Sequence, residues 1–476
     1  MPTFSPGQLA AWSRGRWTAV PTSPITGFTH DTRTLRPGEL FVALKTERRD
    51  GHEFLAAAQA AGAAGALVSR SDPAVALPQL VVADPLGAFQ LIAREHRRLF
   101  RGPVIGITGS VGKTSTKNLL ALLLGGAPAD ADAPGAESTV LATEGTLNNH
   151  IGVPLTLTRL DPARHQFAVI EAGVSGPGEM RPLAGMIEPD LAIITLIAPA
   201  HLQGLGDLEA VAREKAALPA AVRPAGIAVF PRPCLQFDAF RDLSVRTLTI
   251  EAAEVVRPAE PPKDKVFFAI TQRGDVTALA IAYGPPPPLH FTMSRVSAGM
   301  AQNAVLAICA ALWLGLTPAV IQQRLAAWQP AKWRGELRRE AGRLLYLDCY
   351  NANPASMADA LENFASLAAA GEPRTYVLGC MEELGPQAAE YHRRLGRTMH
   401  LRPGDRLFVI GDQAEALREG LLENGNDPAQ IEIVGELAPV AAFLAGFRGA
   451  VFMKGSRRHQ LERALLPAAR REALAC

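Results

Sequence analysis

The chain has few cysteines, almost no net charge and no long hydrophobic run, and each shortage narrows what the protein can be. Cysteine occurs at five of 476 positions (234, 309, 349, 380 and 476), without the paired spacing of a zinc site. A scattered, odd number of cysteines is typical of a reducing compartment, where structural disulfides do not form. We therefore expect a cytoplasmic protein.

The balance of charge argues against two classes of partner. The 48 basic and 46 acidic residues leave a net charge of +2, which is too small to attract nucleic acid or an acidic membrane surface. The longest apolar run, at 304–316, is shorter than a helix that spans a bilayer. The first residues also lack the basic and apolar regions of a secretory signal. We expect no nucleic-acid partner and no membrane insertion.

The length and the strand pattern predict an α/β protein of three domains. A small α/β domain is expected at 1–100, a second domain at 101–330 and a third at 331–476. In the second, apolar strands alternate with helices, which is typical of a parallel sheet covered on both faces. The third shows the same alternation and reads as a doubly wound, Rossmann-like domain. The low-complexity tract at 125–135 is predicted to be a loop.

A glycine-rich turn between a predicted strand and a predicted helix indicates a phosphate-binding loop. Glycines let backbone N–H groups approach phosphate oxygens, a lysine adds positive charge and a hydroxyl can hold Mg²⁺. The strict pattern has a glycine at the position of Ile107, so a chance Gly-Lys-Thr is the alternative, which the strand and helix on either side disfavour. The predicted nucleotide-binding residues are Thr108, Gly109, Ser110, Val111, Gly112, Lys113, Thr114 and Ser115.

Two polar residues follow apolar strands near this loop. Glu171 ends the strand predicted at 167–171, and His201 follows the strand at 191–196. Ligands of open α/β sheets lie at the carboxyl ends of strands, so both side chains could meet a phosphate-bound metal. A solvated glutamate and a structural histidine are the alternatives.

Other polar positions are ambiguous by themselves. Lys215, in a predicted helix, reads as an ordinary solvated lysine. Asn148 and Asn149 could bind a polar ligand or cap a turn. Two loops at the ends of strands in the third domain could bind ligands, or could respectively start a helix and form a solvated basic loop. Their residues are Asp348, Tyr350, Asn351 and Asn353 in one, and Lys454 and Ser456 in the other.

The order of these motifs resembles that of the Mur ligase family. The motifs are Gly-Lys-Thr at 112–114, Leu-Asn-Asn-x-Ile-Gly-x-Pro at 147–154, Ile-Glu-x-Gly at 170–173, Ala-His-Leu at 200–202, Tyr-Asn-Ala-Asn-Pro at 350–354, Met-x-Glu-Leu-Gly at 381–385 and Lys-Gly-Ser-Arg at 454–457. Near the N-terminus, 29–44 and 50–52 resemble the family's uridine-nucleotide domain, and Asp31, Thr32 and Arg33 are the candidate contacts there.

The resemblance implies roles for individual residues. It implies that Lys113, Glu171, His201 and Lys215 are catalytic, and that Thr114, Glu171, His201 and a carbamylated Lys215 hold Mg²⁺. Asn303, Arg334 and Asp348 join the ATP contacts. Asn148, Asn149, Tyr350, Asn351, Asn353, Lys454 and Ser456 are substrate-side positions.

The implied reaction joins D-alanyl-D-alanine to UDP-N-acetylmuramoyl-tripeptide through an acyl phosphate, with ATP and Mg²⁺. The enzyme is expected to be a monomer that acts in peptidoglycan precursor synthesis. The alternatives are a Mur-type ligase that adds another amino acid, and a nucleotide-binding regulator without turnover. The regulator stays open because the sequence departs from the usual residues at several positions. They are Thr146, Gly176, Leu196, Gly299, Met300 and Cys380.

Overall fold

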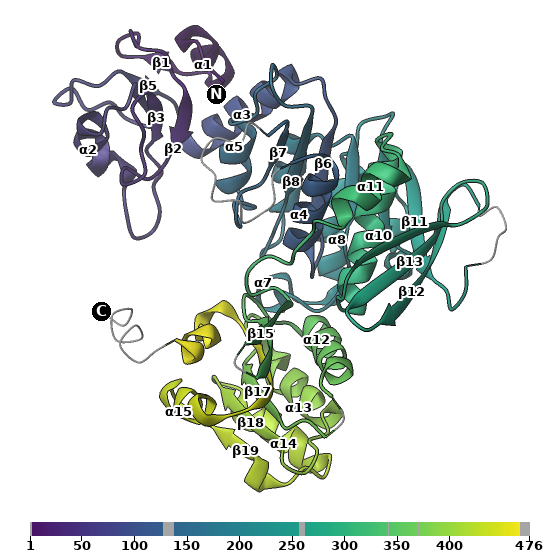
Figure 1. Cartoon of the computed structure of the whole chain (residues 1–476). Helices are drawn as coiled ribbons and strands as arrows, with labels where there is room; N and C mark the ends of the chain where they lie inside the picture. Colours follow the sequence, from purple (N-terminus) through teal and green to yellow (C-terminus); the bar gives the residue numbers. More distant parts are fainter. Residues whose placement is uncertain (1, 127–137, 257–261, 341, 370, 467–476) are drawn as a thin grey trace.

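The computed structural model describes residues 2–126, 138–256, 262–340, 342–369 and 371–466. Most of the loop predicted at 125–135 lies outside these residues. The chain forms three sheets, of five, nine and six strands, arranged in sequence order along an elongated molecule (Figure 1). The α/β class expected from the sequence is therefore confirmed. In the described residues, no helix is long and apolar enough to cross a membrane.

The N-terminal sheet is small, with the strand order β1-β5-β4-β3-β2, and only β1 runs antiparallel. Asp84 caps the first turn of α3, the next residue is proline, and α3 packs its apolar face onto this sheet. The elements are α1 (Pro6–Ser13), β1 (Arg16–Trp17), β2 (Gly27–Thr29), β3 (Glu39–Val42), α2 (Leu55–Ala60), β4 (Gly65–Val68), β5 (Gln79–Val81) and α3 (Pro85–Leu99).

The central sheet has the order β14-β13-β12-β11-β10-β9-β6-β8-β7, parallel from β7 to β12 and antiparallel at β12 to β14. Its strands are β6 (Val104–Thr108), β7 (Val140–Ala142), β8 (Phe167–Glu171), β9 (Leu191–Ile194), β10 (Ile227–Pro231), β11 (Arg246–Ala252), β12 (Lys265–Arg273), β13 (Val276–Ala282) and β14 (Leu289–Ser294).

Helices cover both faces of the central sheet, as continuous apolar strands require. One apolar core lies under α4 (Lys113–Leu123), α10 (Ala298–Trp313) and α11 (Pro318–Leu325). The core of the other face is formed with α5 (Gly152–Leu157), α6 (Met180–Ile187), α7 (Leu202–Leu205), α8 (Leu208–Ala220) and α9 (Asp238–Arg241).

The C-terminal sheet has the order β15-β16-β20-β17-β18-β19, with only β15 antiparallel. Two separate cores, one on each face, make it doubly wound. Its elements are β15 (Glu336–Glu340), β16 (Arg343–Asp348), α12 (Pro354–Leu367), β17 (Arg374–Gly379), α13 (Ala388–Thr398), β18 (Arg406–Ile410), α14 (Ala414–Glu423), β19 (Ile431–Ile433), α15 (Ala438–Gly446) and β20 (Gly449–Lys454).

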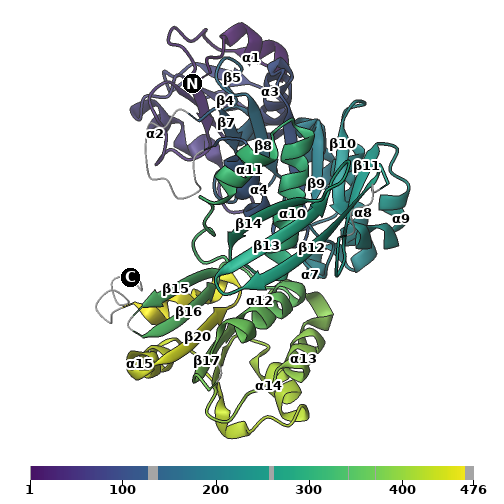
Figure 2. The same ribbon diagram turned by 45° about the vertical axis from the view of Figure 1, so that its right-hand side comes forward.

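The central and C-terminal domains meet where their strands end. In Figure 2, α12 of the C-terminal domain lies beneath α10 and the end of the central sheet, and residues of the two helices are in contact. The carboxyl ends of β6, β8 and β9 thus face the loops that follow β16 and β20. Ligands of α/β sheets bind at such strand ends.

Candidate active site

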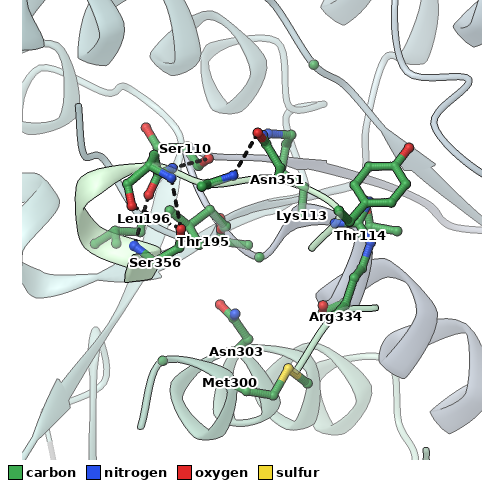
Figure 3. A pocket seen from close by; sticks show the side chains of 18 of the residues that line it. Ser110, Lys113, Thr114, Thr195, Leu196, Met300, Asn303, Arg334, Asn351 and Ser356 are labelled. Carbon is green, nitrogen blue, oxygen red and sulfur yellow. Dashed lines mark hydrogen bonds between the residues drawn. The ribbon is translucent and has the colours of Figure 1, made fainter. Parts of the chain in front are cut away.

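A cavity of about 500 Å³ lies between the central and C-terminal domains. Figure 3 shows its walls, with Lys113 and Thr114 on one element and Met300 and Asn303 on another. Most of the predicted site residues line it. They are Ser110, Val111, Gly112, Lys113, Thr114, Ser115, Asn148, Asn149, Glu171, His201, Asn303, Arg334, Asp348, Tyr350, Asn351, Asn353 and Lys454.

The turn after β6 has a backbone that requires glycine. Gly109 and Gly112 have φ of 145° and 80°. A Cβ on Gly109 would lie 2.0 Å from Thr195 Oγ1, and one on Gly112 would lie 2.2 Å from Asn303 Nδ2. Because Gly112 is the N-cap of α4 and offers no side-chain acceptor, the first N–H groups of α4 keep their capacity to bind an anion.

This turn is fastened to the neighbouring strand end. The Ser110 N–H donates to the Leu196 carbonyl at 2.7 Å, and its hydroxyl donates to the Ala198 carbonyl at 2.7 Å. Lys113 Nζ donates to the Gly109 carbonyl at 2.9 Å, and burial lowers the pKa of this amine. A half-buried cation that makes no ion pair with a carboxylate among the described residues suits an anionic ligand.

Glu171 is buried, with 1% of its surface exposed, so the solvated alternative is wrong. Its Oε1 accepts from the Thr114 hydroxyl at 3.1 Å and from Asn148 Nδ2 at 2.8 Å. Its Oε2 is buried without a hydrogen-bond partner among the described residues. A buried carboxylate oxygen without a hydrogen-bond donor suits a cation as its partner.

The interpretation of Lys215 as a solvated helix lysine is also wrong. Its side chain, on α8, has no exposed surface, and Nζ has no hydrogen-bond partner in the described part of the chain. Burial, with a further contribution from the charge of Lys113, lowers the pKa of Lys215 well below its ordinary value. This burial could not be predicted from the sequence, because α8 also carries exposed charges.

His201 lies between β9 and α7, in the left-handed region with φ of 54°. Its Nδ1 contacts Glu383 Oε2 of the C-terminal domain, and this hydrogen bond lowers the pKa of Glu383. The Gln203 N–H donates to the Glu383 carbonyl at 3.0 Å, so two bonds join the domains here. Glu383 was missed as a site residue, although it occupies the glutamate position of the Met-x-Glu-Leu-Gly motif.

The C-terminal wall is built around a buried ion pair. Lys454 is 1% exposed, which excludes a solvated loop, and its Nζ lies 2.5 Å from Asp348 Oδ2 and 3.2 Å from the Asn351 carbonyl. Asn353 caps α12, as the alternative interpretation expected, and its Nδ2 also reaches the Ser110 carbonyl at 3.5 Å. The loop after β16 therefore contacts the phosphate loop directly.

A tyrosine of the C-terminal domain reaches across the same boundary. The Arg334 guanidinium lies 3.8 Å from the centre of the Tyr350 ring, and the Tyr350 hydroxyl donates to Thr146 Oγ1 at 3.3 Å. Asn149 takes the capping alternative, because its Oδ1 accepts from the N–H groups of Ile151 and Gly152. Its amide nitrogen and its place in the cavity leave a ligand role open.

A few predicted residues do not line the cavity. Ser456 accepts from the Glu382 N–H at 3.2 Å. Asp31, Thr32 and Arg33 follow β2 in the N-terminal domain, where Arg33 and Asp31 form an ion pair at 2.6 Å. Thr108, Gly109 and Lys215 belong to the second layer of the phosphate-loop region, directly behind the residues that line the cavity.

Lys117 is a buried residue that sequence reasoning missed. It lies one turn after Lys113 on α4, and its Nζ donates to the Thr143 carbonyl at 2.5 Å. The Thr143 hydroxyl in turn accepts from the Glu171 N–H at 2.9 Å. Lys117 thus holds the segment that leads from β7 toward Asn148. Its charge on an otherwise apolar helix face was the available signal.

No group of three or more His, Cys, Asp or Glu side chains with the placement of a metal site occurs among the described residues. The chain therefore offers Glu171, His201 and the Thr114 hydroxyl at the cavity, and no complete all-protein cage. This set suits Mg²⁺, which usually takes one or two carboxylates and completes its shell with phosphate oxygens and water.

Comparison with known proteins gives consistent results. Family models described as "Mur ligase middle domain" and "Mur ligase, glutamate ligase domain" match residues 107–311 and 333–457. UDP-N-acetylmuramoyl-tripeptide–D-alanyl-D-alanine ligase of Bacillus subtilis is 31% identical over 84% of this chain and 83% of its own length. The Escherichia coli enzyme of the same name is 33% identical over 82% of each chain. A crystal structure of MurF from Acinetobacter baumannii superposes with a TM-score of 0.83 at 28% identity, covering 98% of both chains.

Proposed function

Because the chain belongs to the Mur ligase family, we propose that it is the ATP-dependent ligase that joins D-alanyl-D-alanine to UDP-N-acetylmuramoyl-tripeptide. The names of the relatives that match over four-fifths of the chain carry this substrate assignment. The observation that carries the chemistry is the cavity itself, in which a phosphate loop, a buried carboxylate and a second domain face one another. We propose the domain limits 1–100, 101–330 and 331–476, each with one sheet.

ATP is a substrate of the proposed reaction. The terminal carboxylate oxygen of the tripeptide bonds to the γ-phosphorus while the bond to ADP breaks, which gives an acyl phosphate. The amine of D-alanyl-D-alanine then bonds to the acyl carbon, inorganic phosphate leaves and the amine loses a proton. The phosphate is needed because the carboxylate alone would have to expel oxide.

The phosphate loop supplies positioning and charge. We expect the phosphates to lie beside the first N–H groups of α4 and the amine of Lys113. Asn303, Arg334 and Asp348 are the proposed contacts to the rest of the nucleotide, since all three line the same cavity. In a cavity closed by a second domain, such charges act in a low dielectric and are worth more than in water.

The residues fit a bound Mg²⁺, which would neutralise phosphate charge in this reaction. Thr114, Glu171 and His201 would hold it. The unpartnered Glu171 Oε2 marks an unsatisfied negative site. The contact of His201 Nδ1 with Glu383 is the kind of support that orients a histidine ligand. Burial lowers the pKa of Lys215, which favours the neutral amine that reacts with CO₂, and the carbamate would replace an unpartnered amine by an oxygen ligand.

We assign UDP-N-acetylmuramoyl-tripeptide and D-alanyl-D-alanine to the remaining walls of the cavity. Asn148, Asn149, Tyr350, Asn351 and Asn353 line the cavity beyond the phosphate loop, and Lys454 and Ser456 support the same wall. The uridine end would contact Asp31, Thr32 and Arg33 in the N-terminal domain. Both walls of the cavity belong to one chain, which supports a monomer as the active form. We infer that the reaction takes place in the cytoplasm, because its substrates carry a nucleotide.

The departures from the usual family residues have local partners in this chain. Thr146 accepts a hydrogen bond from the Tyr350 hydroxyl, and the Leu196 carbonyl accepts one from the Ser110 N–H. The Gly299 N–H donates to an acceptor in the C-terminal domain. Cys380 is 3% exposed, and burial raises its pKa to about 11, so this thiol is neutral where the family commonly has an aspartate. These contacts favour an active enzyme over a regulator without turnover.

Release of phosphate from ATP tests the proposal. We expect release that requires both UDP-N-acetylmuramoyl-tripeptide and D-alanyl-D-alanine, assayed with diaminopimelate and with lysine as the third residue. Release with a single amino acid in place of the dipeptide would instead support another Mur-type ligase. ATP binding without release under any combination would support the regulator.

A further inference from the structure

The first turn of α10 is completed by a residue from another domain. Ser297 caps this 16-residue helix, and its hydroxyl accepts from the Met300 N–H at 3.2 Å. The Gly299 N–H instead donates to Asp359 Oδ1 at 2.8 Å. Asp359 lies on α12, in the C-terminal domain. A carboxylate at a helix N-terminus is favoured both by the hydrogen bond and by the helix dipole.

Glycine at position 299 is what makes room for this carboxylate. A Cβ on Gly299 would lie 2.7 Å from Asp359 Oδ2 and 3.0 Å from Asp359 Cγ. The φ of Gly299 is not in the left-handed region, so the backbone itself would accept other residues. The three atoms nearest to such a Cβ all belong to Asp359, so this side chain is what disfavours a larger residue at position 299.

The carboxylate is half-buried among groups that fix its place. Burial raises the pKa of Asp359, while hydrogen bonds from the Ser297 hydroxyl and the Gly299 N–H act in the opposite direction. Asp348 and Lys454, the ion pair of the C-terminal wall, also act on the pKa of Asp359 with opposite signs. Asp359 thus lies between the first turn of α10 and the polar wall of the cavity.

Two consecutive turns of α10 connect this contact to the phosphate loop. Met300 and Asn303 project from α10 into the cavity (Figure 3). Asn303 packs against Gly112, as shown by the 2.2 Å that would separate its Nδ2 from a Cβ there. A shift in the first turn of α10 would therefore move the two side chains that border the nucleotide side of the cavity.

We propose that Asp359 is a positioning residue that fastens the C-terminal domain to the first turn of α10 and thereby sets Met300 and Asn303 against the phosphate loop. We call this contact the Gly299–Asp359 latch, because the Asp359 carboxylate occupies the space that the missing side chain of Gly299 leaves. The nucleotide-binding consequence rests on the proposed function, whereas the latch is a property of the chain without substrates.

A second interdomain bond provides a matched control. Arg295 Nη2 donates to Ser366 Oγ at 2.8 Å, also between the segment before α10 and helix α12. This bond is exposed, and neither residue lines the cavity. Arg295→Ala removes this contact and also the bond from Arg295 Nη1 to the Gly274 carbonyl, and neither partner belongs to the first turn of α10.

Hydrogen exchange at the Gly299 amide, measured on the full chain without substrates, tests the latch directly. In Asp359→Ala, loss of the hydrogen bond to the carboxylate should speed exchange of the Gly299 amide at least about tenfold. In Gly299→Ala, the same acceleration is expected for the amides of residues 297–300. Asp359→Asn keeps an acceptor oxygen and should restore most of the protection. Arg295→Ala should leave the Gly299 amide as in the parent chain.

The double variant separates a latch from two independent defects. If the two residues act together, the amide at position 299 should exchange no faster in the double variant Gly299→Ala/Asp359→Ala than in either single variant. In each single variant, KM for ATP should rise at least about fivefold, with a smaller change in kcat. Unchanged exchange in Asp359→Ala, additive effects in the double variant, or an equal effect of Arg295→Ala would overturn the proposal. Protected exchange is readable even in a protein without ligase activity, so failure of the proposed function would be seen separately.

Discussion

The two walls of the cavity are held in place in different ways. The central wall is internal to one sheet, since Ser110 is tied to the strand end at Leu196 and Glu171 to Thr114 and Asn148. The C-terminal wall has its own buried pair, Asp348 and Lys454, but reaches the central wall through single hydrogen bonds that cross a domain boundary.

The crossing bonds at the rim of the cavity join Asn353 to Ser110, Tyr350 to Thr146, Glu383 to His201 and Gln203, and Asp359 to Gly299. A further crossing bond, from Arg295 to Ser366, lies away from the cavity. A rigid wall suits groups that must be placed accurately against phosphate, whereas a wall held by single bonds can open to admit three substrates. The comparison predicts large losses for changes in the first wall and smaller, graded losses for changes between the walls.

The largest effect is expected for Lys113→Ala, because it removes the positive charge of the rigid wall. Loss of one such charge-stabilising group costs about 10²–10³-fold in kcat. Steady-state phosphate release measures it, with the melting temperature of the variant as a control for folding. A kcat within tenfold of the parent would remove the phosphate loop from the proposed chemistry.

Glu171→Gln is expected to come next. The amide keeps the shape of the side chain and an acceptor for Thr114, but it loses the charge that the unpartnered oxygen would offer to Mg²⁺. A loss of about 10²-fold in kcat is expected, partly reversed at high Mg²⁺. Titration of activity with Mg²⁺ checks this, and an unchanged midpoint would contradict a ligand role.

Lys215→Arg is expected to reduce kcat by about 10²-fold, since a guanidinium cannot form a carbamate and remains charged. Burial lowers the pKa of Lys215, so the reactive neutral amine makes up a larger fraction than in an exposed lysine, and this fraction decreases as the pH falls. Carbon-13 NMR of the parent chain with labelled bicarbonate should show a carbamate signal that Lys215→Arg lacks. The same signal in both proteins would refute the assignment.

Glu383→Gln tests a bond between the walls. The His201 ring would keep a partner, but not a charged one, and loss of such support typically weakens metal affinity about 10–100-fold. We expect the Mg²⁺ midpoint to rise with kcat at saturating Mg²⁺ nearly unchanged. A lower kcat with an unmoved midpoint would place Glu383 outside the metal site.

The smallest effect is expected for Tyr350→Phe. The ring contact with Arg334 is kept and only the hydrogen bond to Thr146 is lost, so KM for the acceptor should rise about 2- to 10-fold. Thr146→Val is the matched change on the other wall. If the effects of Tyr350→Phe and Thr146→Val on KM were fully additive in the double variant, the hydrogen bond between these two residues would not join the walls.

The sequence predicted the rigid wall well and the contacts between walls poorly. The strand expected at 167–171 coincides with β8, because buried parallel strands are short apolar runs that end at polar turns. The strand expected at 191–196 is shorter in the structure, where β9 ends at Ile194. The start of α4 at Lys113 could not be located from apolar periodicity, since its first turn is polar. The edge strand β15 was missed because it contains alternating charges and is defined by its pairing with β16.

The burial of individual polar residues could not be predicted in the same way. The sequence favoured a solvated Lys215 and left a solvated loop open for Lys454, because their immediate neighbours in sequence allow it, yet both side chains are buried. Asp359 had no motif at all, since its partner is a backbone N–H exposed by a glycine in another domain. Motifs report residues that share a local backbone, whereas these side chains depend on how whole domains meet.

Transfer of oxygen-18 from the tripeptide's terminal carboxylate is the most direct test of the central claim, that this cavity makes a carboxylate electrophilic by phosphorylating it. With labelled UDP-N-acetylmuramoyl-tripeptide, ATP and D-alanyl-D-alanine, mass spectrometry of the products should find one carboxylate oxygen in the released phosphate for each amide formed. Amide formed with unlabelled phosphate would contradict the account.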